Sequence, residues 1–173
     1  MRLLDPDDAS KGIVFDGRLA EDFKLLTGTW VSVGPLKTKL LLHFAPYLRD
    51  LVMTGADRDE LGALFFADGA ACRALCPDLA SGAPESAVLR HGAVRARFAE
   101  LLTELAREAT GSANRVTRGM ILEEPPSIDR NEVTDKGSLN ARVMLDARKD
   151  LVGELYADRP SPRVILARWA PAR

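Results

Sequence analysis

The sequence predicts an α+β fold, with a small sheet of about three core strands flanked by helices and preceded by a short two-stranded hairpin. Short apolar runs bounded by turn residues recur along the chain and are typical of buried strands. Two longer stretches carry apolar residues at helical spacing instead. The two kinds alternate irregularly, which favours a mixed α+β sandwich. A chain of 173 residues has the length of one domain, or of one domain plus a tail.

The first third of the chain carries the predicted hairpin and the first helix. Residues 12–17 and residues 23–31 are short extended segments between turn-forming ends, and they are candidates to pair with each other. Pro35 is expected in the first turn of a helix with Ser32 as its cap, and Pro46 is expected to end that helix. Its apolar residues at helical spacing are Leu36, Leu40, Leu41, Phe44 and Leu48.

The middle of the chain carries two paired strands and the clearest helix. Residues 51–53 and 61–66 are apolar runs on either side of a polar loop, as in two paired buried strands. Residues 76–90 show little periodicity and contain two prolines, so they are expected to form a loop. The helix covers residues 94–109, and Gly111 supplies its stop. Its apolar stripe is Val94, Phe98, Leu101, Leu102, Leu105 and Ala109.

The last third supplies a third core strand, residues 116–122, and then a polar irregular stretch to residue 137. Ser138 is placed to cap a last helix. Residues 1–157 are therefore expected to form one domain, and residues 158–173 a tail that is either an edge strand or disordered. The apolar face of the last helix is Leu139, Val143, Met144, Ala147, Leu151 and Leu155.

Composition excludes several classes of function. The formal net charge of -1 gives no bulk attraction to nucleic acid or to anionic lipid, and 6% aromatic residues are too few for base-stacking platforms. No apolar run approaches the length of a membrane span, and the N-terminus turns acidic too early for a secretory signal. Cys72 and Cys76 are too few for a disulfide framework or a zinc site and indicate packing thiols. We therefore expect a cytoplasmic protein with no metal site and with no nucleic-acid or membrane partner.

No complete catalytic constellation is visible, and His43 and His91 stand alone. One stretch has unusual local chemistry, because Lys136 lies on a glycine-containing loop just before the predicted last helix. A lysine there faces the positive end of the helix dipole, which is unfavourable for structure alone. The same place suits a meeting with a phosphate or carboxylate brought from elsewhere. The commoner alternative is a solvated loop lysine.

Five short stretches together resemble a known family. They are Phe-Asp-Gly-Arg at 15–18, Thr-Gly-Thr-Trp-Val-Ser at 27–32, Asp-Arg-Asp-Glu at 57–60, Pro-Pro-Ser-Ile-Asp at 125–129 and Thr-Asp-Lys-Gly-Ser at 134–138. In this order they resemble the C-terminal domain of the adenylate-forming superfamily of acyl-CoA synthetases, peptide synthetases and luciferases. Within it they look most like feruloyl-CoA synthetases. The resemblance covers about residues 5 to 156.

The resemblance implies a mobile lid with two working faces. In that family a large N-terminal domain binds ATP and the acid, while the small C-terminal domain takes two orientations. Lys136 would be the lysine that stabilises adenylation, although it precedes Gly137 where the usual pattern puts lysine directly after glycine. Arg18 would contact the nucleotide. The hinge would fall within residues 19–22, with Ala20, Glu21 and Asp22 as the hinge residues. The CoA-facing residues would be Gly28, Thr29 and Trp30.

The function implied by the resemblance is the catalytic lid of an acid–CoA ligase. Such an enzyme activates an aromatic, ferulate-like acid as acyl-AMP and transfers it to CoA, with ATP and CoA as substrates and Mg²⁺ accompanying ATP. The expected partner is the N-terminal domain of the same enzyme, so Met1 would be internal to a longer protein and the isolated chain would be inactive. The exposed docking face could also support a dimer. The alternative is a stand-alone nucleotide- or protein-binding module with this fold and no catalysis.

Overall fold

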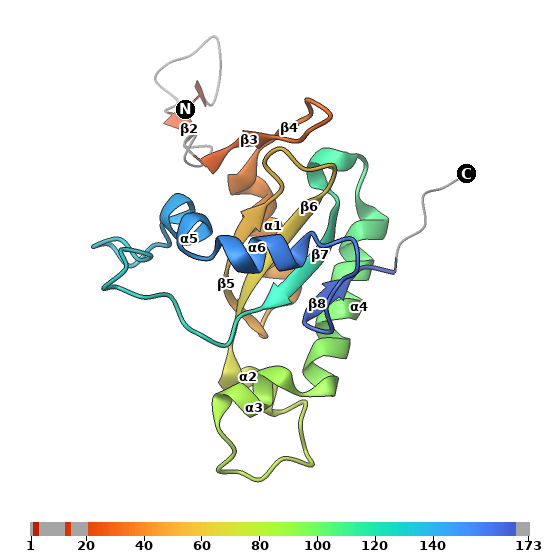
Figure 1. The fold of residues 1–173 in the computed structure, drawn as a ribbon, viewed down its shortest axis with the longest axis vertical. Helices are drawn as coiled ribbons and strands as arrows, with labels where there is room; N and C mark the ends of the chain where they lie inside the picture. The colour runs from red at the N-terminus through yellow and green to blue at the C-terminus, as the bar shows by residue number, and fades with distance from the viewer. Residues whose placement is uncertain (1, 4–12, 15–20, 169–173) are drawn as a thin grey trace.

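The structure, a computed structural model, describes residues 2–3, 13–14 and 21–168, with backbone alone for the first two pairs. A four-stranded sheet forms the centre of the described part, with the strand order β5-β6-β7-β8 (Figure 1). The β6 and β7 strands are parallel, and the two outer pairs are antiparallel. The strands are β5 (Leu48–Thr54), β6 (Leu61–Ala67), β7 (Val116–Ile121) and β8 (Val164–Leu166).

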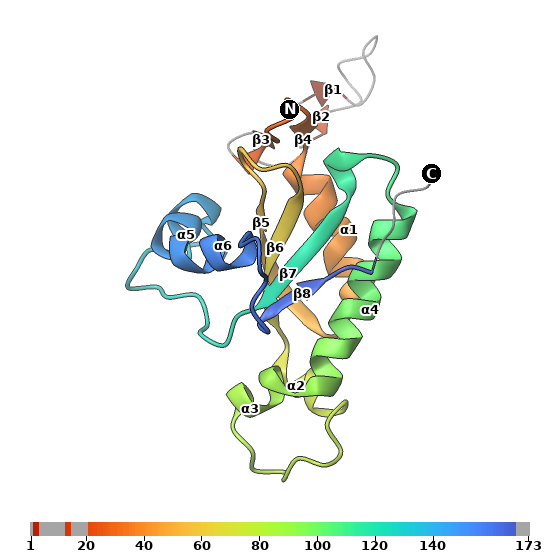
Figure 2. The same ribbon diagram turned by 45° about the vertical axis from the view of Figure 1, so that its right-hand side comes forward.

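Helices cover both faces of this sheet. Figure 2 shows α1 and α4 on one side of the sheet, and α5 and α6 on the other. Both faces of the sheet are buried, and successive residues of a strand pack into the cores on opposite faces. Phe65 packs toward α1 and α4, whereas Leu64 packs toward α5 and α6. The helices are α1 (Val33–Phe44), α4 (Gly92–Glu108), α5 (Ala141–Ala147) and α6 (Lys149–Leu155).

The α+β class predicted from the sequence is confirmed, as are both members of the central strand pair, the third strand and the long helix α4. The sheet has one strand more than the expected three, because β8 pairs antiparallel with β7 at the edge. Thus part of the C-terminal tail belongs to the sheet. No helix within the described ranges combines the length and the apolar character that a bilayer crossing requires.

The connection from β6 to β7 contains helices α2 (Gly69–Arg73) and α3 (Glu85–Arg90) before α4. The prediction that residues 76–90 form a loop is therefore wrong for their last part. Pro84 takes the N-cap position of α3, and Val88 and Leu89 are buried. This helix is too short to show a periodic apolar pattern, so packing against its neighbours decides its conformation.

The predicted two-stranded hairpin is present, but it forms within the second N-terminal segment and not between the two segments. Instead β2 (Ile13–Val14) pairs with β1 (Arg2–Leu3), and β3 (Phe23–Lys24) pairs with β4 (Trp30–Val31). The second segment closes on itself because Gly28 has a φ of 82°, a left-handed conformation that glycine adopts without a steric penalty.

The predicted last helix is two short helices, α5 and α6. The N-cap of α5 is Asn140 and not Ser138, with the Asn140 Oδ1 accepting a hydrogen bond from the Val143 amide at 3.4 Å. Leu139 instead pairs with Val133 in an isolated antiparallel bridge. The chain leaves helical geometry at Arg148, the residue between the two helices. The changed helix start therefore lies at the end of the loop that carries Lys136.

Candidate functional site

Lys136 lies at the tip of a tight turn between the two residues of that bridge. The Gly137 amide donates to the Thr134 carbonyl at 2.8 Å, and the Thr134 amide donates to the Ser138 carbonyl at 2.8 Å. Gly137 has a φ of 77°, which completes the hairpin turn that ends in a left-handed glycine. Lys136 is exposed and forms no ion pair with any residue in the described part of the chain. Its position is therefore set by this turn, and not by a helix N-terminus as predicted.

A buried ion pair holds the base of this turn. Glu132 and Arg148 are 0% and 6% exposed, and the two Glu132 oxygens accept from Nε and Nη2 of Arg148, both at 2.9 Å. The Ser127 amide also donates to Glu132, at 2.7 Å. Hydrogen bonds from Arg148 outweigh burial and hold the pKa of Glu132 at about 2. The carboxylate is therefore ionised at neutral pH.

The remaining donors of Arg148 bind the chain just after β7. Nη1 donates to the Glu124 carbonyl at 3.1 Å, and Nη2 donates to the Pro125 carbonyl at 3.0 Å. The guanidinium also lies over the Phe66 ring, 5.6 Å from its centroid. A single side chain thus connects α5, the start of the loop and Glu132.

Sequence reasoning did not single out Glu132 or Arg148. One signal was present, because Arg148 falls on the apolar stripe of the predicted last helix, four residues after Met144 and three before Leu151. A charged residue on an apolar face requires a buried partner or an interruption of the helix. The structure shows both.

The second candidate region is the β3–β4 hairpin, which contains Gly28, Thr29 and Trp30. Its turn has the same pattern as the Lys136 turn: the Gly28 amide donates to the Leu25 carbonyl, and the Leu25 amide donates to the Thr29 carbonyl, both at 2.9 Å. Leu26 and Trp30 are 65% and 50% exposed. The hairpin therefore presents two large apolar side chains to the surface.

Apolar packing and main-chain hydrogen bonds hold this hairpin. Leu25 and Val31 are buried in the core on the α1 and α4 face of the sheet. The Leu26 amide donates to the Arg58 carbonyl at 2.9 Å, and the Asp57 amide donates to the Lys24 carbonyl at 3.2 Å. The structure thus places the hairpin against residues 57–60, a stretch singled out separately in the sequence.

A polar cluster around Tyr156 also contacts residues 57–60. Glu60 pairs with Arg118 of β7, and the Tyr156 hydroxyl lies 2.9 Å from the Thr54 hydroxyl and 3.2 Å from the Glu60 carbonyl. The guanidinium carbons of Arg58 and Arg118 each lie 5.1 Å from the Tyr156 ring centroid. Burial raises the pKa of Tyr156 to about 12, so its hydroxyl stays protonated and neutral.

The proposed hinge is only partly visible. Arg18 and Ala20 lie outside the described residues. Asp22 caps α1, because its Oδ1 accepts from the Val33 amide at 2.8 Å, whereas Ser32 occupies the N-cap position without a side-chain bond. Glu21 and Asp22 border a groove of about 400 Å³ that reaches the start of α5, lined also by Lys37, Met53, Asn140 and Arg142.

The Lys136 loop and the hairpin point in different directions. In Figure 1 the hairpin lies beyond the upper end of the sheet, whereas the loop between β7 and α5 projects to the left. In Figure 2 the loop again projects left, on the side of the sheet covered by α5 and α6. The structure therefore does not bring Lys136 together with Gly28, Thr29 and Trp30.

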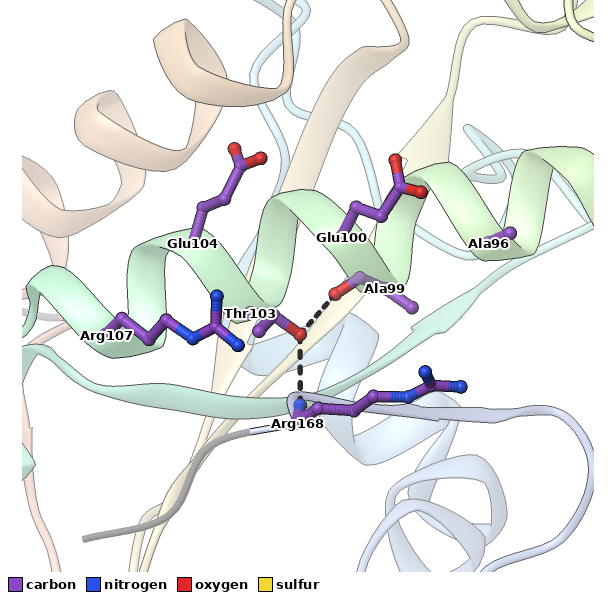
Figure 3. A pocket seen from close by; sticks show the side chains of 7 residues that line it. All are labelled: Ala96, Ala99, Glu100, Thr103, Glu104, Arg107 and Arg168. Carbon is purple, nitrogen blue, oxygen red and sulfur yellow. Dashed lines mark hydrogen bonds between the residues drawn. The ribbon is translucent and has the colours of Figure 1, made fainter. Parts of the chain in front are cut away.

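A further pocket of about 320 Å³ lies on the exposed side of α4 (Figure 3). Thr103 donates to the Ala99 carbonyl at 2.6 Å and accepts from the Arg168 amide at 3.0 Å, so it joins the helix to the chain after β8. Glu104 at the rim lies 3.3 Å from Nε2 of His43. That nitrogen is also 3.1 Å from the Leu101 carbonyl, which makes His43 a bonded histidine at the helix interface.

The two cysteines are packing residues in the described structure. Cys72 and Cys76 are free and buried. Burial raises the pKa of Cys72 to about 12 and also raises that of Cys76. A thiol that stays protonated is a poor nucleophile and a poor metal ligand.

Comparison with known proteins adds information on the fold. No protein-family model matches the chain, and no curated protein matches it. Its structure is similar to the adenylation domain of the carboxylic acid reductase of Segniliparus rugosus, solved with AMP and a co-purified carboxylic acid (TM-score 0.62, 19% identity, 83% of this chain and 21% of that chain). It is equally similar to the adenylation domain of the carboxylate reductase from Mycobacterium chelonae (TM-score 0.62, 19% identity, 83% and 20%).

A third structure, the didomain of adenylation and peptidyl carrier domains of the Segniliparus rugosus reductase with AMP, matches with a TM-score of 0.58 at 19% identity, over 79% of this chain and 17% of that chain. The chain therefore has a fold that occurs within the adenylation domains of carboxylic acid reductases. It spans about a fifth of the length of these solved chains. None of the three is a feruloyl-CoA synthetase.

Proposed function

We propose that this chain is the C-terminal lid of an adenylate-forming enzyme and that Lys136 is its catalytic lysine. The observation that carries the proposal is the placement of Lys136, exposed on a turn whose base is held by the buried Glu132–Arg148 pair. A fold that occurs within adenylation domains supports it, as do the five stretches of sequence. A merely solvated loop lysine would not need so rigid a support.

The proposed chemistry uses Lys136 in the first half-reaction. The carboxylate of the acid attacks the α-phosphorus of ATP. The bond between the α-phosphorus and the oxygen that bridges it to the β-phosphate breaks, so pyrophosphate leaves and acyl-AMP forms. Negative charge on the oxygens around phosphorus is stabilised by the ammonium group, which a flexible side chain can deliver across a closing interface. A positioned charge of this kind contributes about 3–4 kcal/mol to transition-state stabilisation. ATP would arrive with Mg²⁺ on a larger N-terminal domain, with Arg18 contacting the nucleotide.

The second half-reaction would use the hairpin. After rotation about the hinge at Ala20, Glu21 and Asp22, residues 28–30 would face CoA, whose thiolate attacks the acyl carbonyl and displaces AMP. The exposed side chains of Leu26 and Trp30 support a surface that another domain covers in one orientation. We further propose a ferulate-like aromatic acid as substrate, on the sequence resemblance alone. The lid would span residues 1–157, and β8 adds part of the tail to its sheet.

The proposal is tested by Lys136→Ala in a protein that joins this chain to a large N-terminal adenylation domain. Acid-dependent exchange between ATP and pyrophosphate should fall about 100- to 1,000-fold, while conversion of preformed acyl-AMP and CoA to thioester changes little. Lys39→Ala is the matched control, because Lys39 is exposed on the opposite side of the sheet and has only a surface ion pair with Glu108 at 3.4 Å.

The outcome separates two classes of protein. If Lys136→Ala leaves the exchange reaction unchanged, the catalytic assignment is wrong, and a stand-alone nucleotide- or protein-binding module becomes the better description. The chain alone should show no exchange with any acid. A panel of cinnamic, benzoic and aliphatic acids with the joined protein then tests the aromatic substrate.

A further inference from the structure

We propose that Glu132 and Arg148 are positioning residues for Lys136, needed for adenylation and dispensable for thioester formation. The inference rests on the proposed function of Lys136. It assigns a task to a buried charged pair that lies beside the apolar core on the α5 and α6 face of the sheet. The pair lies at the base of the turn, and it does not touch the reacting groups.

Both ends of the turn converge on Glu132. Its main-chain carbonyl accepts from the Asn140 amide at 2.8 Å, so the same residue meets the outgoing chain at the start of α5. Its main-chain amide donates to the Ser127 carbonyl at 3.0 Å, and its side chain accepts from the Ser127 amide at 2.7 Å. The bridge residue Val133 directly follows Glu132, and Lys136 lies three residues further on. A shift of Glu132 would therefore move the whole turn.

Arg148 fixes Glu132 in direction as well as in distance. Two parallel hydrogen bonds of 2.9 Å join the guanidinium to the carboxylate, and this bidentate geometry permits one relative orientation. The carbonyls of Glu124 and Pro125 hold the other side of the guanidinium. Apolar side chains in these places would fill the space without fixing the register of the loop, because hydrophobic contact has no direction.

The other polar side chains of the loop make weaker or more exposed contacts. Ile128 is 76% exposed, and Arg130 adds only a long contact of 3.4 Å to Glu132 together with an exposed pair to Glu124 at 2.7 Å. The Val133–Leu139 bridge closes the turn, and the apolar contact of Leu139 and Val133 with the core on the α5 and α6 face also connects it to the sheet. Because hydrophobic contact has no direction, the orientation of the turn relative to the sheet depends on the hydrogen bonds of the buried pair.

The decisive variant replaces both charges, as in E132M/R148M. Exchange of a buried ion pair for apolar side chains of similar size commonly leaves stability intact. The Ser127 amide and the Glu124 and Pro125 carbonyls lose their side-chain partner, so the fold should persist with a modest loss of stability while the loop loses its register. In the joined protein we expect adenylation to fall about 100-fold, since a misplacement of about 1 Å can have that effect. Thioester formation from acyl-AMP should change less than about threefold, and unfolding should remain cooperative with a modestly lower melting temperature.

The matched control is R90A. Arg90 forms a bidentate pair of the same kind with Glu123, the residue directly before the loop, at 2.7 and 2.5 Å. Unlike Arg148, Arg90 is exposed. Its removal should leave both half-reactions unchanged. The conservative variant R148K keeps the charge without the bidentate geometry, and it should lose adenylation to an intermediate extent.

Hydrogen exchange on the 173-residue chain measures loop order without any assay of activity. The amides of Thr134 and Gly137, which are hydrogen-bonded in the turn, should exchange faster in E132M/R148M and normally in R90A. If Lys136→Ala leaves adenylation intact, the proposed function itself fails. If Lys136→Ala abolishes adenylation but a folded E132M/R148M retains it, or loses both half-reactions equally, the positioning role is wrong. Should the double variant not fold, R148K is judged by the same criteria.

Discussion

The β3–β4 hairpin and the Lys136 turn (residues 134–138) share a backbone hydrogen-bond pattern but differ in the side chains that support them. Each closes on a left-handed glycine, Gly28 or Gly137, and each glycine's open side has no atom within 4 Å of an added Cβ. The hairpin is held by buried Leu25 and by main-chain hydrogen bonds to the turn between β5 and β6. The Lys136 turn has buried Leu139 at its end and, in addition, a buried charged pair at its base.

This difference corresponds to what each turn presents. The hairpin exposes apolar side chains, and the side chains that support it are apolar, so it needs burial but less orientational precision. The Lys136 turn presents a charge, whose effect on a reacting phosphate depends steeply on distance in a site from which water is excluded. Directional hydrogen bonds suit the second case better than hydrophobic contact. The comparison predicts that the two turns respond differently to loss of the charged pair and to acid, but alike to substitution of their glycines.

The largest expected effect is the loss of one member of the buried pair. Arg148→Met leaves the Glu132 carboxylate buried without its cation, and such a loss commonly costs about 3–5 kcal/mol of stability. Urea unfolding of the chain measures it, and E132M/R148M should recover most of the loss. A single variant as stable as the parent would show that water already reaches Glu132, and the contrast with the hairpin would disappear.

Acid should loosen the Lys136 turn before the hairpin. The folded-state pKa of Glu132, about 2, lies below its ordinary value of 4.5, so the pair contributes fully above about pH 4.5 and is lost as the pH falls toward 2. The effect is smaller than that of Arg148→Met, because a protonated carboxyl still accepts hydrogen bonds. The amide chemical shift of Ser127, which donates to Glu132, should titrate over this range.

The Gly28 amide is the internal reference for that titration, because its acceptor is the Leu25 carbonyl and not a carboxylate. In E132M/R148M the Ser127 response should vanish. Simultaneous loss of the Gly28 and Ser127 signals would indicate global unfolding, and would remove the distinction between the two turns.

The smallest effect concerns the glycines themselves. Gly28→Ala and Gly137→Ala should each destabilise by about 1–2 kcal/mol, the cost of a left-handed conformation for an L-residue. Nothing in the surroundings adds a clash at either position, so the two values should agree. The corresponding Asn variants should cost less. A clearly smaller destabilisation by Gly137→Ala than by Gly28→Ala, measured by urea unfolding, would mean that the Lys136 turn relaxes more easily than its buried contacts suggest.

Elements with a strong local signal were predictable. The apolar stripe of α4 and the apolar runs of β5, β6 and β7 appear where the sequence places them. The pairing of β3 with β4 was not predicted, although Gly28 stood in the right place for it. Several short extended segments compete for partners, and local sequence does not state which will meet.

For the candidate site, the sequence by itself determined that Lys136 stands beside a glycine in a polar loop, since a turn needs little more than its own residues. Only the tertiary structure decided what holds that loop. Glu132 and Arg148 are 16 residues apart and meet because α5 packs back on the sheet. Likewise Asp22 caps α1 from 11 residues away. Such contacts depend on the path of the folded chain, because directional bonds between distant residues leave no periodic trace in the sequence.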